Sequence, residues 1–344
     1  MIELFPEQTL RAQLERVNQN TIRFETPDTP YYPLEAEAGD LDRFGFPPRP
    51  NEYEHPDLYA FWHKMFSRGI EEFVEIDFSL LPPQQGTGSA QSARTLFSRS
   101  HREGSRNWSG AYITPRDGRM FTDVVGSWYV PTVSAPPGWP PSDTYGSSVW
   151  IGLDGQRRYL HSTLPQIGTG QYLNLPSVPG STTTAWFQWW PQNEMTLPMT
   201  MVPGDYVMAW LLVLNPTQVH MLLFNWSRLS LARFVWPAPT VIMPPFIMTP
   251  VQANVSGATA EWITERPAVA PTPILYNLPN YSTVHFEDCM AASALNPGMA
   301  FVDRDVDNPR LIRMYRRATN PRRTVTISVA RRVSEHEVET RYQV

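Results

Sequence analysis

The stretch from Tyr206 to Trp226 reads Y-V-M-A-W-L-L-V-L-N-P-T-Q-V-H-M-L-L-F-N-W and holds two apolar runs around a polar break. The first run, Val207 to Leu214, has about eight residues and is too short to span a bilayer. Asn215 and Pro216 begin the break, and a second run follows from Met221. Two such runs separated by a short turn predict a buried β-hairpin.

Similar segments extend in both directions from this hairpin. From Asn107 onward, short runs rich in Val, Ile, Tyr and Trp alternate with turns made of Gly, Pro, Asn and Ser. They include N-W-S-G-A-Y-I, V-V-G-S-W-Y-V, S-S-V-W-I-G-L, T-A-W-F-Q-W-W, A-T-A-E-W-I and T-V-T-I-S-V. Many short strands at this spacing predict an all-β fold, a β-sandwich or a barrel. The 35 prolines argue against a helical bundle, because proline breaks long helices.

Residues 1–105 have a different character and are predicted to form an N-terminal extension to a β-sandwich domain over residues 106–344. The extension is acidic and holds two helical patterns. Leu10, Leu14 and Val17 form a short stripe, and a stronger stripe begins at Leu58 and recurs as far as Phe73. A Pro-, Gly- and Ser-rich linker is expected to run from residue 82 to Arg106.

Several classes of function lack the residues that they require. The net charge of −5 gives no basic field for nucleic acid. The one cysteine, Cys289, allows no internal disulfide. The sequence contains no H-E-x-x-H metal motif, no G-x-S-x-G elbow and no phosphate-binding glycine loop. We therefore expect no metal, no cofactor, no nucleic-acid partner and no membrane partner. The sequence does not determine the oligomeric state, and a monomer is favoured.

Four sequence blocks in the β region carry the most specific signal. The first is N-W-S-G-A-Y-I (107–113), followed by G-S-W-Y-V-P (126–131), and the second is S-S-V-W-I-G-L-D-G (147–155), followed by P-Q-I-G-T (165–169). The third is A-W-F-Q-W-W-P (185–191), followed by P-G-D (203–205), and the fourth is S-G-A-T-A-E-W-I-T-E (256–265), followed by L-P-N-Y-S-T-V-H-F (278–286). In order and spacing these blocks resemble the glutamic peptidases, the eqolisins, over roughly residues 105 to 290.

The resemblance implies a fold, an activity and a set of site residues. The fold would be an antiparallel β-sandwich of two large sheets, and the activity would be acid endopeptidase cleavage of a polypeptide substrate. The catalytic dyad would be Gln166 and Glu261. The residues expected to line the substrate site are Trp150, Asp154, Gln188 and Trp190. Family members are secreted and carry pro-segments, so the resemblance suggests that residues 1–105 are a pro-segment or lid, processed near Arg102 or Arg106, although no signal peptide is visible.

Two departures from the family pattern bear on this interpretation. Gln188 occupies a position where the family usually has glutamate, which leaves the pH optimum and the subsite preference open. Cysteines common in the fungal members are absent, so the chain looks more like a bacterial-type member.

Residue chemistry agrees with the proposed dyad. In A-T-A-E-W-I, period-two alternation places Glu261 on one strand face with Thr259 and Ile263, and Ala260 and Trp262 on the opposite, core face. A carboxyl group beside apolar residues has a raised pKa, so it can accept a proton from water and later return it. The amide of Gln166 offers uncharged N–H donors for an oxyanion.

Other interpretations remain open at this point. An aromatic-rich β-sandwich can bind carbohydrate or protein without catalysis, and a degenerate peptidase homologue would have only an interaction role. A glycosidase could use paired carboxylates such as Asp154 and Glu261. Geometry separates these interpretations, because only the peptidase needs the Gln166 amide and the Glu261 carboxyl to converge on one water in an open groove.

Overall fold

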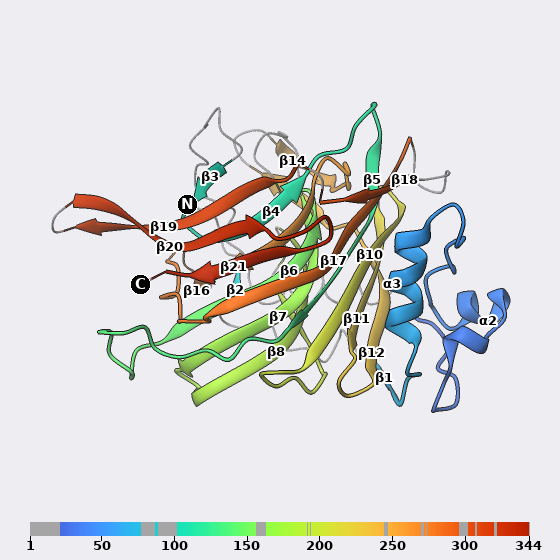
Figure 1. Ribbon diagram of the computed structural model, residues 1–344, viewed down its shortest axis with the longest axis horizontal. Helices are drawn as coiled ribbons and strands as arrows, with labels where there is room; N and C mark the ends of the chain where they lie inside the picture. The colour runs from blue at the N-terminus through green and yellow to red at the C-terminus, as the bar shows by residue number, and fades with distance from the viewer. Residues whose placement is uncertain are drawn as a thin grey trace.

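We describe a computed structural model of the chain, shown in Figure 1. The structure describes residues 21–76, 87–88, 102–155, 163–190, 192, 194–243, 247–269, 272, 274–295, 302–306, 308–319 and 322–343. The predicted helix at Leu10–Val17 lies outside these residues. Within them, no helix is long and apolar enough to cross a membrane.

The fold is dominated by strands, as predicted. The helices are η1 (Pro33–Glu35), α2 (Ala38–Arg43) and α3 (Pro56–Phe66). The strands are β1 (Glu72–Val74), β2 (Thr87–Gly88), β3 (Arg102–Ser105), β4 (Trp108–Ile113), β5 (Met120–Tyr129), β6 (Tyr145–Leu153), β7 (Leu164–Leu175), β8 (Val178–Trp190), β9 (Met195–Leu197), β10 (Tyr206–Asn215), β11 (Gln218–Asn225), β12 (Ser230–Pro237), β13 (Thr240–Met243), β14 (Ile247–Gln252), β15 (Ala260–Glu265), β16 (Ala268–Val269), β17 (Thr283–Ala294), β18 (Val302–Asp305), β19 (Arg310–Thr319), β20 (Arg322–Arg332) and β21 (Val338–Tyr342). The all-β class is therefore confirmed.

The sheet architecture differs from the expected pair of separate antiparallel sheets. Seventeen of the described strands belong to one mixed sheet, which curls until it is nearly closed into a barrel. The two expected sheets are joined into one by a series of paired strands, β19 with β20, β20 with β21, and β21 with β17. Two pairings are parallel, β1 with β12 and β3 with β19. Sequence alternation predicts which residues face inward, but it does not predict whether neighbouring strands close into one sheet.

The inner core lies between the two sides of this sheet. Strands β6, β7 and β15 contact β5, β10 and β11 across it. Trp262 of β15 donates a hydrogen bond from its indole nitrogen to the Val125 carbonyl of β5, at 2.8 Å. The predicted hairpin forms as β10 and β11, with Val207 facing this core and Met208 facing outward. Each strand thus has an inner face and an outer face.

The N-terminal extension covers the outer face of one side. Helix α3 lies beside β10, β11 and β12 in Figure 1. Its Phe61, Trp62 and Phe66 are buried with Trp210 and Phe224 of those strands in an outer core. The helix ends at Phe66, earlier than the stripe suggested, but Ile70 and Phe73 join the same outer core from the following chain. Burial of this apolar stripe is what holds the extension in place.

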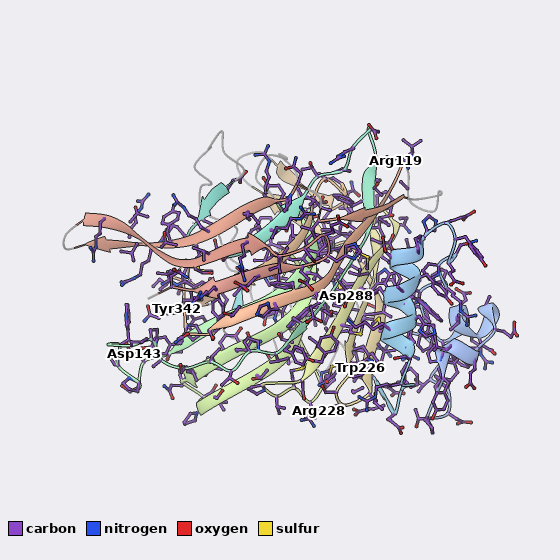
Figure 2. The ribbon with its side chains drawn as sticks, viewed as in Figure 1. Arg119, Asp143, Trp226, Arg228, Asp288 and Tyr342 are labelled. Carbon is purple, nitrogen blue, oxygen red and sulfur yellow. The ribbon has the colours of Figure 1, made fainter. Side chains whose placement is uncertain are left out.

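A polar contact also joins the extension to the sheet. Lys64, the chain's one lysine, donates from Nζ to Asp288 Oδ2 at 2.7 Å and to the Tyr206 hydroxyl at 2.8 Å. Asp288, labelled in Figure 2, lies at an irregularity of β17, where its register against β5 shifts. These contacts fix the orientation of α3 on the outer face.

The predicted linker is not irregular throughout. Its last residues form β3, which pairs with β19, so the linker ends before Arg102. Most of the segment between β1 and β3 lies outside the described residues. The hypothesis that residues 1–105 are a pro-segment or lid stays a prediction.

Candidate active site

A single register row brings the predicted catalytic residues together. Glu261 of β15 pairs with Gly152 of β6, Gly152 pairs with Gln166 of β7, and Gln166 pairs with Gln188 of β8. Paired residues in a sheet project to the same side, so Glu261, Gln166 and Gln188 share one face. We call Glu261, Gly152, Gln166 and Gln188 the catalytic row. It lies on the outer face, since the alternate residues Trp262, Ile167 and Phe187 face the inner core.

Gly152 leaves the middle of the row without a side chain. Glu261 and Gln166 are two strands apart, roughly 10 Å between backbones at the usual strand spacing. A Cβ atom at Gly152 would approach Leu164 Cδ1 and Trp150 Cζ3 at 3.0 Å. The glycine therefore lets Leu164 and Trp150 pack closely over the strand that separates the acid from the amide.

A chain of amides orients Gln166. Its Nε2 donates to Gln188 Oε1 at 2.5 Å, and Gln188 Nε2 donates to the backbone carbonyl of Gln192 at 2.6 Å. Gln166, Gln188 and Glu261 are all buried, so the row is covered by neighbouring side chains and does not line the open groove that was expected. At this position a glutamine accepts one hydrogen bond and donates another, which an ionised glutamate could not do. Glutamine in place of the usual glutamate at position 188 thus gives Gln166 an uncharged hydrogen-bond acceptor that is itself held in place.

Glu261 is a buried acid with a strongly perturbed environment. Its side chain is 1% exposed. Oε1 accepts a hydrogen bond from the Thr259 hydroxyl at 2.8 Å, and Oε2 has no hydrogen-bond partner among the described residues. Burial raises the pKa of Glu261 well above its ordinary value, and the charges of Asp154 and Glu265 raise it further, against the lowering effect of Thr259. Such a group can exchange a proton with a reactant.

Aromatic side chains surround the row on the same outer face. Trp150 packs edge-on against Trp108, with ring centroids 5.3 Å apart. Trp190 is only half-buried and packs against the same cluster. We call this cluster the aromatic wall; it consists of Trp108, Tyr112, Trp150, Leu164, Trp186, Ile263 and Ile312, with Trp190 at its edge. Trp189, in contrast, faces the inner core.

Glu265 was not singled out from the sequence, yet it lies on the same strand face as Glu261. Its Oε2 accepts from the Trp150 indole at 2.9 Å, and its Oε1 accepts from the Asn107 amide at 3.1 Å. Burial raises the pKa of Glu265 to about 8, although these hydrogen bonds lower it. The spacing of four residues along β15 was the available signal, because it returns to the same face.

Asp154 directs its carboxylate to the chain that leads into β15. Oδ1 accepts from the Ala258 backbone N–H and the Ser256 hydroxyl, both at 2.8 Å, and Oδ2 accepts from the Ser256 backbone N–H at 2.6 Å. Its backbone is in the left-handed region, with φ 67°. Burial raises the pKa of Asp154. Asp154 therefore fixes the backbone segment that precedes Glu261 in the chain. Its role in substrate binding stays a prediction.

The described residues offer no set of ligands for a metal. They contain no group of three or more His, Cys, Asp or Glu side chains arranged to hold an ion. Cys289 is buried in the inner core, and burial raises the pKa of its thiol well above the ordinary value. A thiolate nucleophile is therefore not provided there.

Comparison with known proteins decides the family. The model of the Peptidase A4 family matches residues 106–334. The chain belongs to the peptidase A4 family. It is thus a glutamic-type peptidase, as the four sequence blocks predicted.

Two solved structures are similar to this chain. Scytalido-glutamic peptidase with a peptide-based transition-state analog is 19% identical, with a TM-score of 0.51, over 69% of this chain and 98% of that one. The same peptidase with a transition-state analog inhibitor is 18% identical, with a TM-score of 0.52 and the same coverage. These structures show a shared fold. No curated protein matches the sequence.

Proposed function

We propose that this peptidase cleaves internal peptide bonds of a polypeptide with Glu261 and Gln166 as its catalytic dyad. The observation that supports the proposal is the catalytic row. A buried acid and a fixed amide project from the same sheet face, and the strand between them carries a glycine. A peptide carbonyl and one water need that arrangement on a single side of the sheet.

Glu261 acts first as a base. Its ionised carboxylate accepts a proton from a water molecule, whose oxygen attacks the carbonyl carbon of the scissile bond. The protonated Glu261 then delivers that proton to the leaving amine as the C–N bond breaks. One carboxyl group performs both transfers, so no covalent intermediate with the protein is formed.

Gln166 stabilises the charge that develops on the carbonyl oxygen. Its amide donates an N–H to the tetrahedral oxyanion, a contribution of roughly 3 kcal/mol per donor. Gln188 contributes indirectly, because its acceptor oxygen fixes the orientation of the Gln166 amide. A donor that is already oriented needs no reorganisation during the reaction.

The pH dependence follows from the ionisation of Glu261. The base must have lost its proton, so activity rises with pH through the pKa of Glu261. Burial raises that pKa above the ordinary 4.5, so the lower limb of the profile lies above that pH.

The test is digestion of casein and of a defined peptide between about pH 2 and pH 7, where carboxyl groups titrate. Glu261→Gln and Gln166→Ala are compared with wild type. We expect Glu261→Gln to abolish cleavage, and Gln166→Ala to lower kcat by roughly 100-fold. Glu339→Gln serves as a control, since Glu339 is also a buried glutamate but pairs with Arg331 away from the row. A folded Glu261→Gln variant with full activity would refute the dyad.

The glycosidase alternative receives less support from the same geometry. It requires two carboxyl groups directed at one bond, roughly 5–10 Å apart. Asp154 instead uses both of its oxygens on the chain before β15. Assay with a soluble polysaccharide alongside casein separates the two activities.

A further inference from the structure

Strand β3 immediately precedes the region matched by the family model, which begins at residue 106. It pairs in parallel with β19, with Glu103 opposite Ile312 and Ser105 opposite Met314. Glu103 is 2% exposed and Ser105 is 1% exposed. A short strand with two buried polar side chains must satisfy both of them with nearby partners.

Glu103 binds a residue that lies directly beside Glu261. Its Oε1 accepts a hydrogen bond from the Tyr112 hydroxyl at 2.8 Å and lies 3.6 Å from Arg310 Nη1. Tyr112 of β4 is the register partner of Glu261 on β15. Directly opposed residues in antiparallel strands have Cβ atoms roughly 5 Å apart on the same face. Tyr112 is therefore the cross-strand neighbour of Glu261 on the side away from Gln166.

Ser105 is connected to the aromatic wall by a separate series of hydrogen bonds. Its hydroxyl donates to Asn107 Oδ1 at 3.1 Å and accepts from the Trp108 backbone N–H at 3.1 Å. Asn107 in turn donates to Glu265, which accepts from Trp150. Glu103 and Ser105 of β3 thus both contact groups that surround the catalytic row.

We propose that β3 is a positioning strand of the active site, in which Glu103 holds Tyr112 against Glu261. The tyrosine ring then limits the orientations of the Glu261 side chain and excludes water on that side. Cleavage at Arg106 would cut the covalent link between β3 and β4, so the proposal predicts that β3 is part of the functional catalytic unit. This inference rests on the proposed function, because Tyr112 matters to catalysis only if Glu261 reacts.

The test is a double-mutant cycle in the full chain. Glu103→Ala and Tyr112→Phe remove the same hydrogen bond from opposite ends, and Tyr112→Phe keeps the ring. We expect each variant to lower kcat by about fivefold to tenfold and to leave KM within about twofold of wild type. An effect of this size on kcat is ordinary for two residues in direct contact. The double variant should be no slower than the slower single variant. Effects that multiply would overturn the proposal.

Two further variants separate positioning from folding. Glu103→Gln keeps an acceptor for the Tyr112 hydroxyl and should restore kcat to within about twofold of wild type. If it is as slow as Glu103→Ala, the hydrogen bond is not what matters, and the proposal fails. The control is Glu339→Ala, which removes another buried glutamate paired with an arginine and should leave kcat unchanged. Glu103→Gln and Tyr112→Phe decide the question even if Glu103→Ala does not fold.

The outcome is distinguishable from failure of the dyad. If Glu261→Gln retains activity, the proposed function is wrong. If Glu261→Gln is inactive while the Glu103 and Tyr112 effects multiply, the dyad stands and only the role of β3 is wrong.

Discussion

Glu265 makes the stability of this protein depend on pH in a direction opposite to that of most carboxyl groups. Its pKa in the folded chain is raised to about 8 from an ordinary value of 4.5, because burial penalises the charged form. Between these two values the folded state keeps a proton that the unfolded chain has lost. The stabilisation is therefore complete below pH 4.5 and is lost as pH rises through 8.

The size of the effect follows from the shift. A pKa raised from 4.5 to about 8 corresponds to about 5 kcal/mol of stability, at roughly 1.4 kcal/mol for each tenfold change in proton affinity. Glutamine cannot ionise, so Glu265→Gln removes this dependence on pH while keeping a side chain of similar size. It also keeps an oxygen that can accept the hydrogen bond from Trp150.

The assay compares two inactive proteins, so that autolysis does not interfere. Glu261→Gln is the background, because it also removes the titration of the neighbouring buried carboxyl. Urea denaturation of Glu261→Gln and of Glu261→Gln/Glu265→Gln is measured from about pH 4 to pH 9, below and above both values. We expect the unfolding free energy of the background to fall by about 5 kcal/mol more than that of the double variant over this range. Parallel curves would refute the argument that Glu265 is protonated in the folded state.

Three further predictions concern the catalytic row and the outer core. Gly152→Ala brings a methyl group to about 3.0 Å from Leu164 and Trp150 in the middle of the row, so these side chains must shift and kcat should fall at least tenfold while circular dichroism shows a folded sheet. Unchanged kcat would mean that the packing over Gly152 does not matter to the reaction. Gln188→Ala removes the acceptor that orients Gln166 and should lower kcat several-fold at constant KM in steady-state kinetics, whereas a pure KM effect would assign it to substrate binding. Trp62→Ala leaves a cavity in the outer core and should lower the unfolding free energy by about 3–5 kcal/mol in urea titrations, with kcat unchanged. A loss of less than about 1 kcal/mol would show that the extension is not part of the cooperative fold.

The sequence predicted the features that depend on short stretches of chain. Alternation in β15 correctly separated Glu261 from Trp262, because successive side chains in a strand point to opposite faces. The hairpin of β10 and β11 was found because a turn separates two apolar runs. The α3 stripe gave a helix, although not its end, since Ile70 and Phe73 join the same core without being helical. The family blocks identified a glutamic peptidase.

Only the tertiary structure decided which distant residues become neighbours. Glu265 meets Asn107 although 158 positions separate them, and Glu103 contacts a tyrosine that pairs with Glu261 from another strand. Closure of the strands into one mixed sheet likewise depends on pairings such as β3 with β19. Local periodicity determines the face on which a side chain lies, but the register between strands far apart in the chain is set by packing of the whole core. The amino-acid sequence therefore determined the strands and the chemistry of the site, and the assembled sheet determined the row and its supports.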